Sequence, residues 1–150
     1  MKIVAAVVAA INAIPAARWP GSVVPPVYFA LAPVTSGGAR IRPPYVVVED
    51  SSGEQAELTS GGSIYSCTLS VTVYALGLEQ CVDLLEVVRF GGEPVSQRAG
   101  LDGAGLTISG GRLHHVATIP KSGRRGLAGF DFQAMRVFLA SQEYEVLVAE

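Results

Sequence analysis

The clearest pattern in this chain lies between residues 64 and 90, where a two-residue alternation changes directly into a helical repeat. Over residues 65–75, one set of alternate positions is apolar or aromatic and the other is mostly Ser or Thr, which predicts a strand with one buried face. After Gly77 the apolar positions follow helical spacing instead. They are Leu78, Cys81, Val82, Leu85 and Val88. A strand is therefore expected to lead into the helix that covers it.

Similar patterns predict the other elements. An amphipathic helix is expected over residues 2–14, with Ile3, Val7, Ile11 and Ile14 on its buried face. Further strands are expected at 27–32, 45–48, 112–119, 130–139 and 144–148. Two segments rich in Ser, Gly or basic residues, 51–63 and 120–129, are expected to be loops.

Two helices against five or more strands, with neighbouring strands joined mostly by turns, predict an α+β fold. We expect a mainly antiparallel sheet with both helices packed on one face. The length of 150 residues predicts a single domain, 1–150, with a core that needs neither disulfides nor metals.

The composition is unusually apolar for such a domain. Hydrophobic residues make up 49% of the chain and charged residues 16%, against roughly 25% charged in ordinary soluble domains. The longest apolar run, 3–11, is far shorter than the roughly 18 residues that a membrane-spanning helix needs, so we expect no membrane association. The better explanation is a subunit that buries a second surface against copies of itself or other proteins.

The net charge of −2 and the pI near 5.7 argue against general nucleic-acid binding, which requires a clustered positive field. One local basic cluster stands out: Lys121, Arg124 and Arg125. It suits a few phosphate contacts or an acidic patch on a partner. A solvated hairpin tip is the alternative explanation.

Candidate catalytic chemistry is sparse. His114 and His115 are adjacent, so in a strand they point to opposite faces and cannot ligate one metal together. Asp83 and Glu86 are one helical turn apart, but they lie on the polar face of the predicted helix. Both cysteines, Cys67 and Cys81, fall on predicted core faces. We therefore predict no catalytic, cofactor or metal site, and no enzyme.

Two strands and one helix carry a resemblance to a known family. The strand Pro44-Tyr45-Val46-Val47-Val48, a polar loop, the alternating strand Tyr65 to Ala75 and the helix after it follow an N-terminal helix and precede late strands. This order resembles the tail-terminator, or tail-completion, proteins of long-tailed phages. It spans most of the chain, although 18–38 is longer and richer in proline than in that family.

The resemblance implies a structural virion protein, made in the host cytoplasm and located in the virion tail. Its copies would close a ring, commonly hexameric, that ends the tail tube and meets the head connector or neck protein. DNA would pass through the lumen without sequence-specific binding. The candidate interface or lumen residues are Phe90, Lys121, Arg124 and Arg125, with loops 50–63 and 120–129. The alternatives are another neck or tail-tube subunit, a small enzyme or a nucleic-acid-binding module.

Overall fold

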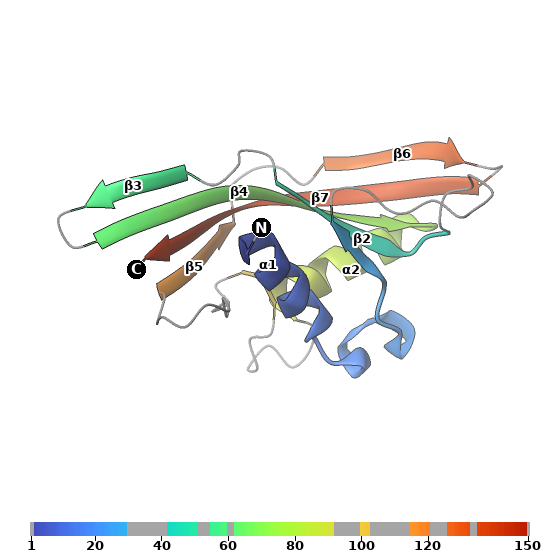
Figure 1. Cartoon of the computed structure of the whole chain (residues 1–150). Helices are drawn as coiled ribbons and strands as arrows, with labels where there is room; N and C mark the ends of the chain where they lie inside the picture. Colours follow the sequence, from blue (N-terminus) through green and yellow to red (C-terminus); the bar gives the residue numbers. More distant parts are fainter. Residues whose placement is uncertain are drawn as a thin grey trace, which may run out of the picture.

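The computed structural model describes residues 2–29, 42–50, 55–59, 62–91, 100–102, 115–120, 126–132 and 135–149. Its centre is a pair of long antiparallel strands, β4 (Gly62–Ala75) and β7 (Met135–Ala149), which pair from Ile64 opposite Ala149 to Ala75 opposite Phe138 (Figure 1). The other described strands pair with one of these two strands, or in the case of β1 with β2.

Each central strand carries two shorter strands in succession along its other edge. β2 (Tyr45–Asp50) and β3 (Gln55–Thr59) pair with β4, whereas β5 (His115–Pro120) and β6 (Gly126–Phe132) pair with β7. β1 (Val27–Phe29) adds to β2 and makes the parallel contact in an otherwise antiparallel sheet. In the described residues the sheet has seven strands, with the path β1-β2-β4-β7-β5.

Both helices, α1 (Lys2–Asn12) and α2 (Leu78–Phe90), lie on the same side of the sheet (Figure 1). Two short 3-10 turns, Ala16–Arg18 and Pro20–Ser22, connect α1 to β1. The predicted fold class is therefore confirmed: an α+β arrangement with a mainly antiparallel sheet and two helices on one face. Among the described residues, no helix has the length and hydrophobicity needed to cross a membrane.

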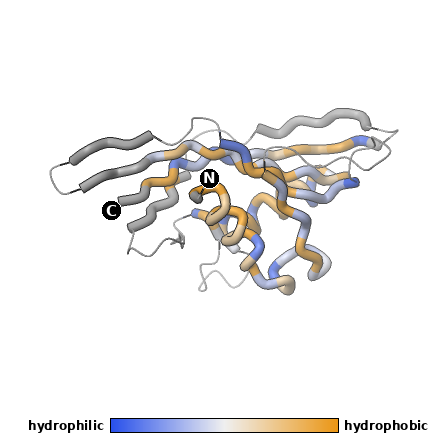
Figure 2. Tube along the Cα trace, in the orientation of Figure 1, coloured by the Kyte–Doolittle hydropathy of each residue, from blue (hydrophilic) through white to orange (hydrophobic). Residues whose placement is uncertain are grey.

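The core lies between this side of the sheet and the helices, and the hydrophobic residues concentrate there (Figure 2). The predicted alternation on β4 is confirmed from residue 66 to 75, since its odd-numbered side chains are buried and its even-numbered ones are partly exposed. All four residues predicted for the buried face of the N-terminal helix are buried, as is Val4. The helix was expected to reach residue 14 but ends at Asn12, so Ile14 enters the core from just beyond it. The buried residues contributed by α2 are Cys81, Leu84, Leu85, Val87 and Val88.

The expected buried face of α2 was partly wrong. Leu78 is 48% exposed and Val82 is only partly buried, whereas Leu84 and Val87 enter the core. The helix packs with the 81/84/85/88 face toward the sheet, because that set gives a continuous apolar stripe at i, i+3, i+4 and i+7. Leu78 lies at the first turn, beyond the end of that stripe.

The expected bounds of two loops and one strand were also wrong. Residues 51–63 were expected to be a loop, but β3 occupies 55–59 and forms a hairpin with β4. The segment 130–139 is not one strand, because β6 ends at Phe132 and β7 begins at Met135, so that the two form a hairpin. Likewise, the expected loop 120–129 contains the start of β6 at Gly126.

The physical reasons are local. β3 is polar because it lengthens one end of the sheet as an edge strand, where no apolar face is required. The residues between β6 and β7 are Gln133-Ala134, and this sequence has none of the Gly, Asn, Asp or Pro signals that predict a hairpin turn. The expected strands at 27–32 and 112–119 are confirmed over their described residues as β1 and β5, whereas 30–32 and 112–114 lie outside the described residues. The tail strand forms the end of β7.

Candidate functional site

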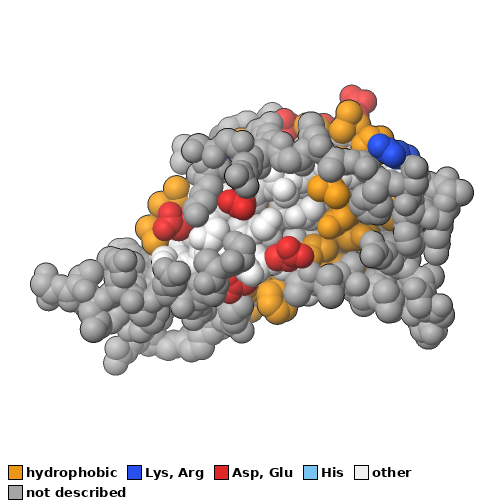
Figure 3. Space-filling model, turned by 90° about the horizontal axis from the view of Figure 1, so that it is seen from above, with side chains coloured by type: hydrophobic (Ala, Val, Ile, Leu, Met, Phe, Trp, Pro, Cys, Tyr) orange, Lys and Arg blue, Asp and Glu red, His pale blue; other side chains and the backbone are white. Residues whose placement is uncertain are grey.

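The side of the sheet opposite the helices is partly exposed along the described middle of β4 and β7, and we call it the open face, although Tyr45 and Val47 of β2 on the same side are buried. Partly exposed Ser and Thr side chains of β4 lie along its middle. Figure 3 shows this face from above, with acidic side chains placed around an uncharged centre. Ser70 on β4 stands between Glu49 on β2 and Glu143 on β7 in one cross-strand row. Glu145 lies opposite Thr68 in the neighbouring row. Hydroxyls and carboxylates therefore mark the described centre of this face as a polar, negatively charged surface.

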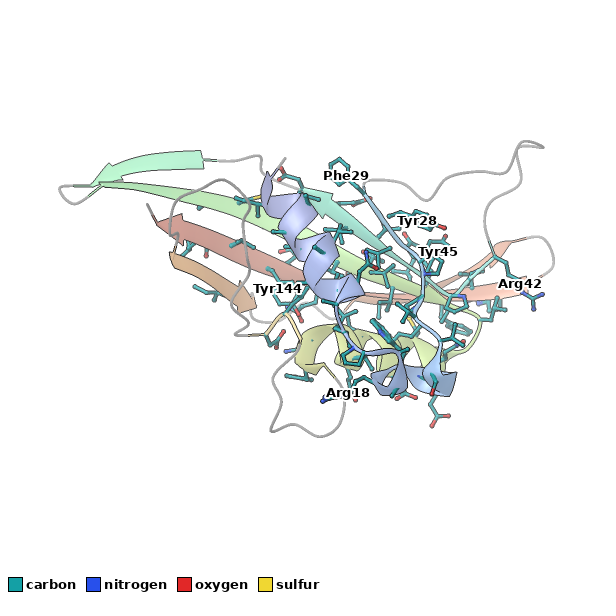
Figure 4. All side chains as sticks on the ribbon, turned by 60° about the horizontal axis from the view of Figure 1, so that its bottom comes forward. Arg18, Tyr28, Phe29, Arg42, Tyr45 and Tyr144 are labelled. Atoms are coloured by element: carbon teal, nitrogen blue, oxygen red, sulfur yellow. The ribbon has the colours of Figure 1, made fainter. Side chains whose placement is uncertain are left out.

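Three tyrosines cross the open face next to this polar area. The rings of Tyr45 and Tyr74 are stacked, with centroids 4.7 Å apart and an interplanar angle of 23°. Tyr28 meets Tyr45 edge-on at 6.2 Å (Figure 4). Such contacts add about 0.5–1.5 kcal/mol each beyond the area they bury. The row ties β1 to β2 and β4, and thereby fixes the edge of the sheet at β1.

The sheet ends on each side in a strand with an exposed apolar side chain. Phe29, at the end of β1, is 53% exposed, and Ile119, on β5, is 44% exposed. Figure 4 shows Phe29 further along β1 than Tyr28. Among the described residues, no strand pairs with the outer edge of either β1 or β5. We refer to these as the β1 edge, with Phe29 and the neighbouring Glu49, and the β5–β6 edge, with Ile119.

A partly buried polar cluster lies at the C-terminal end of α2, on the helix side of the sheet. Arg89 donates from Nη2 to Asp102 Oδ2 at 2.8 Å and from Nε to the same oxygen at 3.2 Å. The hydroxyl of Tyr144 donates to Asp102 Oδ1 at 2.5 Å. The Asp102 carboxylate therefore joins α2 to β7 through two charge-assisted contacts.

The electrostatics of this cluster favour its present protonation states. The hydrogen bonds to Asp102 raise the pKa of the Arg89 guanidinium. Burial, with the hydrogen bond to Asp102 as the next contribution, raises the pKa of the Tyr144 phenol well above its ordinary value. Both groups therefore keep their protons at neutral pH.

The backbone of residues 100–102 also binds the C-terminal end of α2. The amides of Leu101 and Asp102 each donate at 2.8 Å, to the carbonyls of Val88 and Arg89. Gly91 ends the helix in the left-handed region at φ 78°, and its amide donates to Val87 at 2.7 Å. A Cβ on Gly100 would come within 2.3 Å of the Arg89 carbonyl oxygen, so only glycine allows this approach.

The sequence-predicted site residues fall in different places. Phe90 lies at the last position of α2, 43% exposed, with the Arg89 guanidinium 4.8 Å from its ring centroid. Lys121, Arg124 and Arg125 lie outside the described residues, although their segment joins Pro120 of β5 to Gly126 of β6 on the same edge of β7.

The residues weighed for catalysis are accounted for as follows. Asp83 and Glu86 are exposed on α2, as expected of a polar helix face. Asp102 is bound by Arg89 and Tyr144, and so is already engaged in a structural contact. His114 lies outside the described residues. No group of three or more potential metal ligands occurs in the part of the chain that the structure describes.

Both cysteines are buried, as predicted. Burial raises the pKa of the Cys81 thiol to about 11, which keeps it protonated and unreactive at neutral pH.

Sequence reasoning missed the tyrosine row, the Asp102 cluster and the two apolar edges. Tyr28 and Phe29 were visible as a short aromatic pair in an expected strand, but their strand neighbours were not. Asp102 is 42 residues from Tyr144 in the chain, and no local pattern joins them. These features required the sheet register.

Comparison with known proteins gives one informative result. No protein-family model matches this chain, and no curated protein sequence matches it. Among solved structures, a chain in the virion of a native gene transfer agent particle superposes with a TM-score of 0.59 at 20% sequence identity. The match covers 99% of this chain and 96% of that one. At this identity the likeness is one of fold, extending over nearly the whole of both chains.

Proposed function

We propose that this protein is a structural subunit of a phage-like virion, and that its copies close a ring that terminates the tail tube. The observation that carries the proposal is the end-to-end likeness in fold to a chain of a gene transfer agent virion. The order of elements that resembles tail terminators supports the finer assignment. In this proposal the whole chain, 1–150, acts as one domain with a structural and not a catalytic role.

The described surface suits a ring subunit. A ring arises when two different patches of a subunit fit each other and the rotation between copies closes. The β1 edge and the β5–β6 edge are two such distinct patches, each with a large exposed apolar side chain, Phe29 and Ile119. We propose a hexameric ring whose other partners are the tail-tube protein on one side and the head-connector or neck protein on the other.

The open face is the candidate lining of the ring. Its hydroxyls and its carboxylates Glu49, Glu143 and Glu145 offer no fixed positive charge to a phosphate backbone. A negatively charged, hydroxylated wall repels DNA weakly and holds no particular sequence. Such a wall allows DNA to pass through the lumen without specific binding.

Phe90 is the candidate contact along the tail axis. It lies on the helix side of the sheet, it is 43% exposed, and the Arg89 side chain against its ring holds its position. We assign Phe90 to the contact with the tail tube or the connector. The Phe90→Asp variant should still form rings but should bind tube ends at least about tenfold more weakly. Leu78→Asp, at a similarly exposed position of the same helix, is the matched control.

The decisive experiment combines native mass spectrometry of the purified protein with electron microscopy after mixing it with tail tubes. Closed rings that cap tube ends and stop their growth would support a tail terminator. Self-assembly into long tubes would instead identify a tail-tube subunit, and binding to the head portal alone would identify a neck protein. A protein that stays monomeric both alone and with tubes would contradict the proposal.

A further inference from the structure

The contact between Arg89 and Phe90 does not follow from helix geometry. These are the last two residues of α2, and successive side chains of a helix point about 100° apart, so that they do not face each other. Nevertheless, the guanidinium carbon of Arg89 lies 4.8 Å from the centroid of the Phe90 ring. A free arginine side chain has many rotamers. A contact outside α2 is therefore needed to hold Arg89 over the ring.

Asp102 supplies that contact. Its Oδ2 accepts hydrogen bonds from both Nη2 and Nε of Arg89, at 2.8 and 3.2 Å. Two donors of one planar guanidinium fix the orientation of the group as well as its position. The side chains of Arg89 and Asp102 are only 14% and 13% exposed, so water screens the ion pair in part.

Asp102 is itself fixed from two other directions. The Tyr144 hydroxyl binds its Oδ1 from β7. Its backbone amide donates to the Arg89 carbonyl, and the amide of the buried Leu101 donates to Val88 in the same turn of α2. The carboxylate therefore stands in a defined place relative to both the helix and the sheet.

The other chain neighbour of Phe90 is also held. Gly91 caps α2 with its amide on the Val87 carbonyl, and its own carbonyl accepts a hydrogen bond from Arg18 Nη1 at 3.1 Å. Phe90 is thus a 43% exposed aromatic residue between two neighbours that are each bound to a distant part of the chain. An aromatic side chain that is ordered in advance loses less entropy when a partner binds it.

We propose that Asp102 is the positioning residue of the Phe90 contact. It holds the Arg89 guanidinium against the ring, and it thereby presents the ring to the partner in one orientation. This inference rests on the proposed function, which assigns Phe90 to the contact with the tail tube or the connector. It gives the Asp102 cluster a role beyond joining α2 to β7.

The direct test follows the Phe90 ring by fluorine NMR, in protein whose phenylalanines carry a fluorine at the para position. The signal that is lost in Phe90→Leu assigns the ring. In Asp102→Asn, which keeps the shape of the side chain and removes its charge, this signal should move toward that of free fluorophenylalanine, because Arg89 no longer stays over the ring. Arg89→Lys should give a similar shift, since an ammonium group cannot make the two-point contact.

Val46→Ala is the matched control for a loss of stability alone. Val46 is fully buried on β2, two strands away from β7, so this variant loses core packing without changing a residue of the cluster. Its ring signal should stay in place. An unchanged signal in Asp102→Asn or in Arg89→Lys, or an equal shift in Val46→Ala, would overturn the proposal. Circular dichroism checks that each variant is folded.

Binding to tail tubes separates this role from the proposed function. Asp102→Asn should bind tube ends about two- to tenfold more weakly than the unmodified protein, the factor that ordering one side chain is worth, whereas Val46→Ala should bind as tightly. Unchanged binding by Asp102→Asn, where Phe90→Asp weakens it, would overturn the positioning role and keep Phe90 as a contact. Unchanged binding by Phe90→Asp would instead overturn its contact with the tube, and the fluorine signal would still decide whether Asp102 holds the ring.

Discussion

The two faces of the sheet use the same strands for different purposes. On β4, Val71 is fully buried under the helices, whereas the next residue, Thr72, is partly exposed on the open face. On β7, Tyr144 is buried and hydrogen-bonded to Asp102, whereas its neighbour Glu143 belongs to the open face. Stability is therefore concentrated on the helix-covered face, and the open face is left available for function.

This division has a simple physical origin. Successive side chains of a strand point to opposite faces, so one face is free to vary if the other supplies enough buried apolar area. Here both helices cover the same face, and the core residues of α1, α2 and the sheet form one cluster. The contrast can be tested by changing matched positions on the two faces.

The largest effect is expected for the same substitution on adjacent residues of β4. Val71→Asn should lower the free energy of unfolding by about 3–5 kcal/mol, since it places an amide without partners in the core and removes packing. Thr72→Asn should change it by less than about 1 kcal/mol. Chemical denaturation of both variants measures the difference, and equal effects would show that the open face is also covered.

The next largest loss of stability is expected from changes in the Arg89–Asp102–Tyr144 cluster. Arg89→Leu should cost about 2–4 kcal/mol, because it leaves the Asp102 carboxylate without its charged partner in a largely buried site. Tyr144→Phe should cost about 1–2 kcal/mol, since it removes one hydrogen bond to the same carboxylate.

A double-mutant cycle between Arg89 and Tyr144 measures whether the two contacts act together. If the double variant loses as much stability as the two single variants together, Asp102 does not couple α2 to β7.

A smaller loss of stability is expected from a substitution at Gly100, which lies against the C-terminal end of α2. Gly100→Ser should destabilise the protein by about 1–3 kcal/mol, because its Cβ would overlap the Arg89 carbonyl. Gly77→Ser is the matched control: its Cβ would lie 3.9 Å from Gln80 Cβ, and position 77 is the N-cap of α2. A serine there should stabilise by about 0.3–1 kcal/mol. Thermal melting compares the two, and a neutral Gly100→Ser would show that residues 100–102 can shift.

The last expected effect appears only at alkaline pH and is absent at neutral pH. The pKa of Cys81 rises from 9.0 to about 11 in the folded protein, so between these values the unfolded chain loses this proton while the folded chain keeps it. Stability should therefore be full below pH 9 and should fall by about 2 kcal/mol as pH rises to 11.

Cys81→Ala should remove this part of the alkaline decline. The Tyr144 phenol adds a fall of the same sign at higher pH, and it remains in both proteins. Parallel curves of unfolding free energy against pH for the two proteins would refute the role of the Cys81 thiol.

Much of the helix-covered face could be predicted from the sequence, because it depends on local periodicity. The buried positions of β4 and of α1 followed from alternation and helical spacing, and so did the burial of both cysteines. The prediction was less accurate for α2, where two apolar stripes were possible and packing selected one. It was wrong at β3 and at the turn between β6 and β7, where the residues carry no strong local signal.

Most features of the candidate site could not be predicted from the sequence. Phe90 was expected at a surface, and it is exposed; its part in an interface stays a prediction, as do those of Lys121, Arg124 and Arg125. The tyrosine row joins residues 28, 45 and 74, and the Asp102 cluster joins residues 89, 102 and 144. Such contacts arise from strand register and not from spacing along the chain.

The sequence by itself determined the fold class and most of the core of this protein, because hydrophobic periodicity encodes which face of each element is buried. Only the tertiary structure decided where the edges of the sheet lie and what each edge carries. Phe29 and Ile119 are unremarkable strand residues in the sequence. They become the exposed apolar side chains of two opposite edges only when β1 and β5 end the described sheet on opposite sides, because strand order is set by long-range pairing.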